Sequence, residues 1–298
     1  MHVRSLIASL LLCLAAGLCN AKQAASVGPE LESVVIMRVD GSLVLDPKGG
    51  VVNYSVSTKV TDELRGMLEL AIGKWAFEPV LIDGVPREIR TEMRVMLAAR
   101  PVEGGFRIDV DNVLFPGTEG VLADDAKAVE GSMSGRKLSP PYYPQELAVA
   151  NVRGTVLLAI MISAEGKTEE VAVTQSMLVD VRGQPRLMKQ ALRAFEAASI
   201  FAAKGWNFNI TPERARMPGA ERTVIVPVVF GGSDHKPGEV EVDGKWHTFI
   251  RGPMRPISWQ QQDEGAQHIG VSDVAQGEII PLTSAVALKS NVVGAPLL

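Results

Sequence analysis

Few residues in this sequence could carry out catalysis. Beyond the first residues, the histidines are His235, His247 and His268, which lie in different polar contexts without the spacing of a metal site. Cys13 and Cys19 both lie close to the N-terminus. The sequence contains no nucleophile elbow, phosphate-binding loop or dinucleotide fingerprint. We therefore predict that the protein is not an enzyme and that it uses neither a metal ion nor a cofactor.

Asp109 and Asp111 place two carboxylates on one face of a predicted strand. Such a pair could bind calcium, but a calcium loop needs further oxygen ligands and a glycine turn, which the neighbouring residues do not supply. Phe106, Ile108 and Val110 alternate with the polar residues of this segment. The alternation favours an ordinary strand with a solvated acidic face.

The N-terminus has the features of a secretory signal peptide. Arg4 supplies a positive charge, and residues 6–18 form an apolar run shorter than the roughly 20 residues that span a bilayer. Small residues then suit a signal peptidase, so we predict a signal peptide over residues 1–21 with cleavage after Ala21. Cleavage would remove both cysteines and exclude disulfides and thiolate chemistry. Lipidation at Cys19 and an uncleaved N-terminal anchor are the alternatives.

Two stretches of the chain share one pattern. In each, strand-like runs are followed by an amphipathic helix, a Trp-x-Phe triplet, a turn and a last strand. The triplets are Trp75-Ala76-Phe77 and Trp206-Asn207-Phe208. They could be stacking platforms for a ligand, but a Trp at the end of an apolar helix stripe more commonly buries its ring in a core. The repeat predicts two similar small modules.

Composition suggests the domain boundaries. We predict a first module over residues 30–116, a linker over 117–138 that is rich in small and charged residues, and a second module over 139–231. The extension over 232–298 is predicted to be partly disordered. Within it we expect a hairpin around Asp243-Gly244 and a loose tail beyond Gln260.

A series of residues in the second module follows the order of a known domain. The series consists of Tyr143, Pro144, Gly154, Gly166, an alanine-rich helix, Trp206 and Phe208. Together these residues resemble the C-terminal domain of the TonB family, the periplasmic energy-transducer proteins of Gram-negative bacteria. The first module keeps the helix, Trp75, Phe77 and the last strand but lacks the Tyr-Pro opening. It is similar to a diverged copy of the same domain.

The resemblance implies an α+β fold in which each module has an antiparallel sheet of about three strands with a helix packed on one face. It also implies a non-enzymatic binding role. In the family, the domain pairs an extended segment of an outer-membrane transporter with a sheet edge, so that backbone hydrogen bonds supply affinity. Some such domains are also thought to contact peptidoglycan.

We interpret the chain as a periplasmic binding protein whose partner is a protein or a peptide. A transducer would need an uncleaved membrane helix and a long proline-rich spacer, and the sequence shows neither. The alternatives are an anchored transducer, which would contact the membrane only through an uncleaved N-terminus, and a peptidoglycan-binding envelope protein. The net charge of −4 gives no reason to expect nucleic acid or an anionic membrane surface as a partner.

Overall fold

The computed structural model describes most of the chain beyond the predicted signal peptide, and Leu31–Leu298 form one compact unit. The described residues are 31–82, 84–116, 121–122, 133–231, 244–260, 268–282 and 284–297. Residues 1–21 lie outside them. No described helix is long and apolar enough to cross a membrane.

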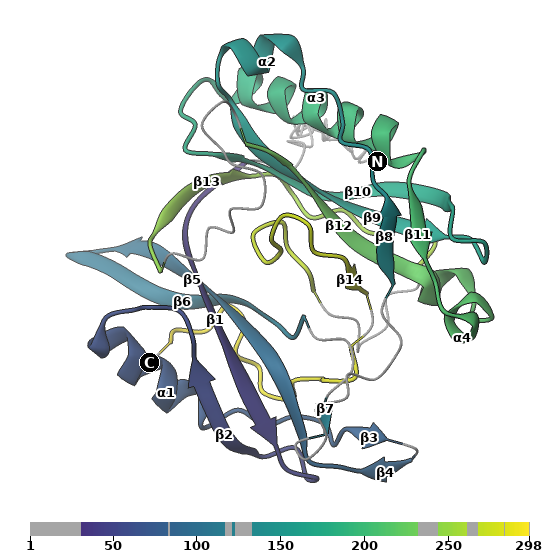
Figure 1. Cartoon of the computed structure of the whole chain (residues 1–298). Helices are drawn as coiled ribbons and strands as arrows, with labels where there is room; N and C mark the ends of the chain where they lie inside the picture. Colours follow the sequence, from purple (N-terminus) through teal and green to yellow (C-terminus); the bar gives the residue numbers. More distant parts are fainter. Residues whose placement is uncertain are drawn as a thin grey trace, which may run out of the picture. The chain divides into compact units, whose positions relative to one another are not determined.

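The first half of the chain forms a hairpin, a helix and a third long strand (Figure 1). Strand β1 pairs antiparallel with both β2 and β5, and β6 pairs with the other edge of β5. The elements are β1 (Glu32–Leu45), β2 (Val51–Val56), α1 (Asp62–Ile72), β3 (Leu81–Ile82), β4 (Val85–Pro86), β5 (Ile89–Val102), β6 (Gly105–Leu114) and β7 (Val121–Leu122).

The second half repeats this order of elements. Strand β9 pairs antiparallel with both β10 and β12, as β1 pairs with β2 and β5. Strand β8 lies inside the predicted linker and pairs with β11. The elements are β8 (Ser134–Lys137), α2 (Gln145–Val149), β9 (Arg153–Ile162), β10 (Thr168–Val179), α3 (Pro185–Ala203), β11 (Asn207–Asn209), α4 (Pro212–Ala215), the 3-10 helix η1 (Gly219–Arg222) and β12 (Thr223–Phe230).

One strand of the extension joins the two halves. Strand β13 (His247–Arg251) pairs antiparallel with β1 on one edge and with β10 on the other. The result is a ten-stranded sheet with the path β14-β12-β9-β10-β13-β1-β5-β6, in which β2 and β7 are side branches and β14 is Ile280–Pro281. The predicted α+β fold, with helices packed on antiparallel sheets, is confirmed.

Helix α1 begins where its capping residue predicts. The Thr61 hydroxyl accepts a hydrogen bond from the Leu64 N–H (3.3 Å), and Asp62 and Glu63 occupy the first turn, where negative charge favours the helix dipole. The apolar stripe of the helix, which includes Leu68, packs onto the sheet. Each such buried leucine stabilises the fold by about 2 kcal/mol.

Alternate residues of the strands serve two different cores. In β9, Val156 and Leu158 pack beneath α3, whereas Leu157 and Ala159 lie in a second apolar cluster on the opposite face. Side chains of the extension complete that second cluster, and Val271 is among them. In the second half the sheet is therefore covered by α3 on one face and by the extension on the other. The last residues of the extension, including Val286 and Leu297, instead pack in the cluster of α1.

Two expectations about the extension are wrong. Residues 247–251 do not form the predicted hairpin, because both edges of β13 are already paired with β1 and β10. The described residues beyond Gln260 are not a loose tail either, since Val271, Ile280 and Leu297 are buried. Their apolar residues have no regular period, because an irregular segment that lies across a sheet face buries side chains at uneven intervals. The first half of the predicted hairpin, residues 239–243, lies outside the described residues.

The same turn occurs in both halves. Gly49 and Gly166 have positive φ angles of 83° and 80°. The carbonyl oxygen of each accepts a hydrogen bond from the triplet phenylalanine, Phe77 N–H (2.9 Å) and Phe208 N–H (2.7 Å). A Cβ atom on either glycine would lie only 2.1 or 2.3 Å from the carbonyl oxygen of that phenylalanine. Both the backbone conformation and the close approach require glycine.

We expect Gly166→Ala to destabilise the protein far more than Gly84→Ala. Both residues have positive φ, but a Cβ on Gly84 would meet no atom within 4 Å, so only the left-handed backbone is penalised there. Urea denaturation should show the free energy of unfolding lowered by about 1 kcal/mol in Gly84→Ala and by about 3 kcal/mol or more in Gly166→Ala. Equal losses in the two variants would contradict the close approach to Phe208.

Candidate interaction surfaces

The extension runs along the outer edge of β10 with its own backbone. After β13 pairs with Met177–Val179, the Gly252 N–H donates to the Ser176 carbonyl (2.8 Å). The Arg255 N–H then donates to the Thr174 carbonyl (2.7 Å). The last half of β10 is therefore closed to any further strand.

The edges of β12 and β6 are also partly covered. Strand β14 pairs with the first residues of β12, and the Leu282 N–H donates to the Thr223 carbonyl (3.4 Å). In a strand, the backbone N–H and C=O groups of every second residue face the same edge, so those of Pro227 face the same edge as those of Thr223. Proline has no N–H group to donate there. At β6, the Val110 N–H donates to the Ala295 carbonyl (2.9 Å). These strands offer short open stretches at most.

Strand β2 has the edge with the least protection. Among the described residues it pairs with β1 alone. Its outward Tyr54 N–H donates to the Asn53 side-chain oxygen (2.8 Å), and its Val56 carbonyl accepts from the Arg65 side chain (3.2 Å). Natural sheets protect open edges with charges, prolines or inward bulges. Residues 51–56 contain no charged residue and no proline.

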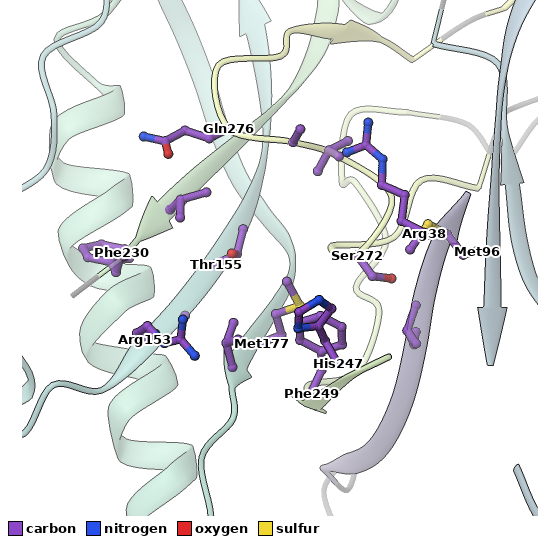
Figure 2. Close-up of a pocket in the computed structure, with 17 residues that line it drawn as sticks. Arg38, Met96, Arg153, Thr155, Met177, Phe230, His247, Phe249, Ser272 and Gln276 are labelled. Carbon is purple, nitrogen blue, oxygen red and sulfur yellow. The ribbon is translucent and has the colours of Figure 1, made fainter. Parts of the chain in front are cut away.

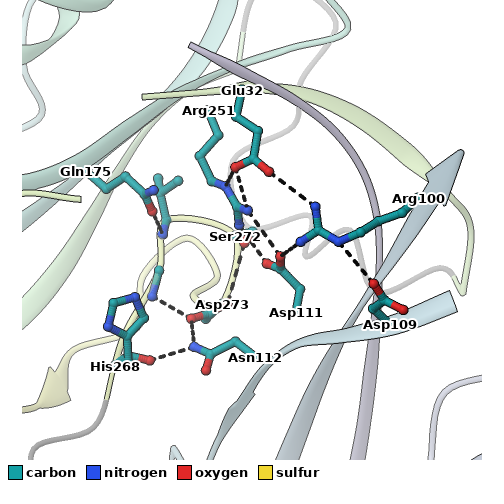
Figure 3. A network of polar contacts seen from close by, with 12 residues as sticks. Glu32, Arg100, Asp109, Asp111, Asn112, Gln175, Arg251, His268, Ser272 and Asp273 are labelled. Carbon is teal, nitrogen blue, oxygen red and sulfur yellow. Dashed lines mark hydrogen bonds and ion pairs between the residues drawn. The ribbon is translucent and has the colours of Figure 1, made fainter. Parts of the chain in front are cut away.

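A buried aspartate fixes the extension to the sheet. The Asp273 carboxylate accepts hydrogen bonds from the Gly270 N–H and the Asn112 amide, both at 2.5 Å (Figure 3). Burial raises the pKa of Asp273 to about 6, because lost hydration opposes its ionisation more strongly than these hydrogen bonds favour it. The carboxylate is thus held between the extension and β6.

Asp109 and Asp111 are ion-pair partners of arginines. Arg251 binds Asp111 with both terminal nitrogens (2.6 and 3.1 Å), and Arg107 binds Asp109 (2.7 and 2.8 Å). Arg100 lies between the two carboxylates (Figure 3). The hydrogen bonds from Arg107 hold the pKa of Asp109 below its usual value. The predicted solvated face is wrong, because the Asp109 side chain is only 1% exposed.

A buried arginine, Arg94, links β5 to the extension. Arg94, 4% exposed, binds Asp40 (3.1 Å) and both carboxylate oxygens of Glu278 (2.8 and 2.9 Å), and it also donates to the Asp273 carbonyl. Arg38 binds Asp40 from the other side (2.7 Å). Removing a carboxylate partner would leave the buried Arg94 guanidinium partly unpaired and destabilise the fold, so these contacts hold the extension in place.

A narrow groove lies between the sheet and the extension. Its volume is about 120 Å³, and its floor includes Met96, Met177 and Phe249, while residues 272–276 form one wall (Figure 2). Arg38 and Arg153 stand at its rim, but Asp40 and Asp180 already pair with them. Thr155, His247 and Ser272 also line the groove.

The residues singled out in the repeat all lie in packed surroundings. Trp75, Phe77, Trp206 and Phe208 are buried, and the Trp206 indole N–H donates to the Ser139 carbonyl (2.7 Å). Their rings present no stacking platform to a ligand.

The residues at the start of the second module are packed in the same way. The Tyr143 hydroxyl donates to the Val152 carbonyl (2.6 Å), and its ring contacts Phe195 and Phe230 edge to face. Pro144 precedes α2, and a Cβ on Gly154 would lie 2.7 Å from the Met177 carbonyl oxygen. These residues therefore contribute to the packing of the second module.

Sequence reasoning missed the residues that hold the extension. Arg94, Glu278 and Asp273 lie far apart in the chain, and no motif connects them. Arg38 and Asp40 did carry a signal, because two charges alternate with apolar residues in an otherwise buried strand. Such an inward-facing pair indicates that a further charged segment must cover that face.

Each half of the chain contains a hairpin, a helix and a later strand, and β13 is added as a strand at one sheet edge of each half. Residues 139–211 match the family described as Gram-negative bacterial TonB protein C-terminal, a non-enzymatic interaction domain of envelope-associated proteins. A search of curated proteins and a search of solved structures each found no significant match. The match supports the TonB resemblance of the second module, while the diverged first copy and the domain boundaries stay predictions.

The Asp273 pKa predicts how stability depends on pH. The folded-state pKa of about 6 lies above the ordinary 3.8, so the folded protein binds this proton more tightly and loses stability as pH rises from about 4 to 6. The amide that Asp273→Asn introduces keeps a carbonyl oxygen for both donors but cannot ionise.

We therefore expect Asp273→Asn to stabilise the protein at pH 7 by up to about 3 kcal/mol and to have little effect below pH 4. Urea titrations of both proteins across this pH range provide the measurement. Asp180→Asn, at an exposed ion pair, is the control and should show no such gain. A difference for Asp273→Asn that does not change with pH would refute the assignment.

Proposed function

We propose that this chain is a non-enzymatic binding protein of the periplasm, which recognises an extended protein or peptide segment by strand addition at β2. A segment of an outer-membrane receptor is one partner of this kind. The TonB C-terminal match over residues 139–211 supports the interaction role. The pairing of β13 with β10 is the observation that supports the choice of β2 as the binding edge.

Strand β13 is an internal example of strand addition. It lies antiparallel on the outer edge of β10, the second strand of the hairpin in the second half. Strand β2 is the second strand of the hairpin in the first half, and its outer edge has no strand partner among the described residues. A partner segment would occupy on β2 the position that β13 occupies on β10.

The equivalence of β2 and β10 rests on their surroundings. Each is joined to its first strand by a turn with a positive-φ glycine, Gly49 or Gly166, and each precedes a helix and a Trp-x-Phe triplet. We infer that the first half is a diverged second copy of the domain. On this view the second half, which matches the family, has its β10 edge occupied by β13. The diverged first half keeps the β2 edge, which a partner can use.

The backbone of β2 is arranged for such a partner. Its outward Tyr54 N–H and Val56 carbonyl are bound by single side chains, Asn53 and Arg65, which an incoming strand can replace. Each backbone hydrogen bond then adds about 1 kcal/mol of net affinity. Alternate side chains of the partner would supply specificity.

Tyr54→Pro should abolish partner binding, because it removes the central outward donor of β2 without removing a donor to β1. Tyr54→Thr is the matched control, since it also loses the ring but keeps the N–H. A photo-crosslinking residue at Val52, which is 56% exposed, would report the contact in intact cells.

We expect protein adducts at position 52 in the parent and the Tyr54→Thr protein, and at least a tenfold loss in Tyr54→Pro. The same probe at Leu70, exposed on α1, serves as the positional control. Circular dichroism must show both variants folded. Adducts that survive Tyr54→Pro, or that never form at position 52, would refute binding at β2.

A further inference from the structure

The outward face of α3 carries an unusual charge. Four cationic residues, Arg186, Lys189, Arg193 and Lys204, follow one another along the helix or directly after it, and Arg182 precedes it. Within the described part of the chain, none of the five forms an ion pair. The whole protein has a net charge of −4, so this concentration of positive charge is local.

Among the residues of α3, no carboxylate lies on the outward face beside the cations. The one acidic residue of α3 is Glu196, which is buried, accepts from the Ser176 hydroxyl (2.6 Å) and binds Arg255 (2.8 and 3.0 Å). Glu196 therefore points toward the sheet and its neighbours.

Helix stability does not explain the cations. The first turn of α3 contains no acidic residue and the helix has no side-chain cap, yet Arg186 and Lys189 lie near its N-terminus. Positive charge at that end opposes the helix dipole, which favours acidic residues there. Residues that oppose helix stability in this way are expected on surfaces that serve a function such as binding.

Large apolar side chains share this surface with the cations. Phe201 of α3 is 75% exposed and Leu187 is 58% exposed. Tyr142, 60% exposed, lies beside Phe201 with the ring centroids 6.5 Å apart. Figure 1 shows α3 lying over β9 and β10, and the buried residues of α3 pack in the core with these strands. The exposed Leu187 and Phe201 therefore lie on the face of the helix away from the sheet.

We propose that the outward face of α3 docks onto an anionic membrane surface. A helix that combines lysine and arginine with exposed aromatic and leucine side chains matches the interface of a bilayer with acidic headgroups. Charge complementarity selects the anionic surface, and the exposed rings of Tyr142 and Phe201 select lipid over a soluble acidic protein, because aromatic rings settle at the headgroup level.

This surface acts independently of β2. The cations and rings lie on α3 and on the segment before α2, whereas the proposed partner edge lies in the first half of the chain. The proposal thus goes beyond the binding role assigned to β2, and neither depends on the other.

The test is co-sedimentation of the full chain with vesicles of phosphatidylethanolamine and phosphatidylglycerol, compared with vesicles of phosphatidylcholine alone. The parent protein should bind the anionic vesicles and release them at high salt. Each cation near such a surface strengthens binding about fivefold, so the triple variant Arg186→Glu, Lys189→Glu and Arg193→Glu should bind on the order of 100-fold more weakly.

The matched control is Lys74→Glu, Arg87→Glu and Arg90→Glu. These three residues are exposed and form no ion pair among the described residues, and the change in net charge is the same. The control variant should bind like the parent. Equal losses in both triple variants would show that net charge alone matters and would overturn the proposal.

A second comparison tests the apolar part of the surface. Phe201→Ser should weaken vesicle binding several-fold, whereas Leu81→Ser, at a site of similar exposure on β3, should not. Binding to poly-glutamate with no binding to anionic vesicles would assign the surface to an acidic protein and overturn the membrane proposal. Circular dichroism of every variant guards against misfolding.

Discussion

The insertion of β13 between β1 and β10 is the interaction on which the rest of the structure depends. All five of its residues pair with β1 and the last three also pair with β10, so one short segment joins a four-stranded and a five-stranded part into one sheet. All five side chains of β13 are only half-buried, so the strand is held mainly by its backbone hydrogen bonds. The C-terminal extension is therefore a structural member of the fold.

The buried charges follow from that insertion. Once β13 aligns the two halves, the faces opposite the helices lie against the extension, and both Arg94 and Asp273 lose contact with water. Each is compensated by partners from the other side: Glu278 for Arg94, and the Asn112 amide for Asp273. Such partners contribute specificity, since the extension can satisfy them in one register alone.

Local signals predicted the two long helices, α1 and α3, but not the assembly. The Thr61 cap and the stripe that ends at Trp75 are properties of neighbouring residues, so periodicity was enough to place α1. The contacts of Arg94 and Glu278 span 184 residues and leave no periodic trace. The expected acidic face at Asp109 failed for the same reason, because its arginine partners belong partly to other strands. The net charge of −4 is a sum over the whole chain and carries no information about the uneven distribution of charge along α3.

The pairing of β1 with β13 also has a consequence for the order of folding. Glu32 and Arg251, which meet in this pair, are 219 residues apart. A chain that emerges from its N-terminus completes both hairpins and both helices long before β13 exists. During that interval the edges of β1 and β10 are bare, and strand edges without partners invite aggregation. Contacts between residues so distant in sequence form slowly, so closure of the sheet by β13 is the step that ends this vulnerable period.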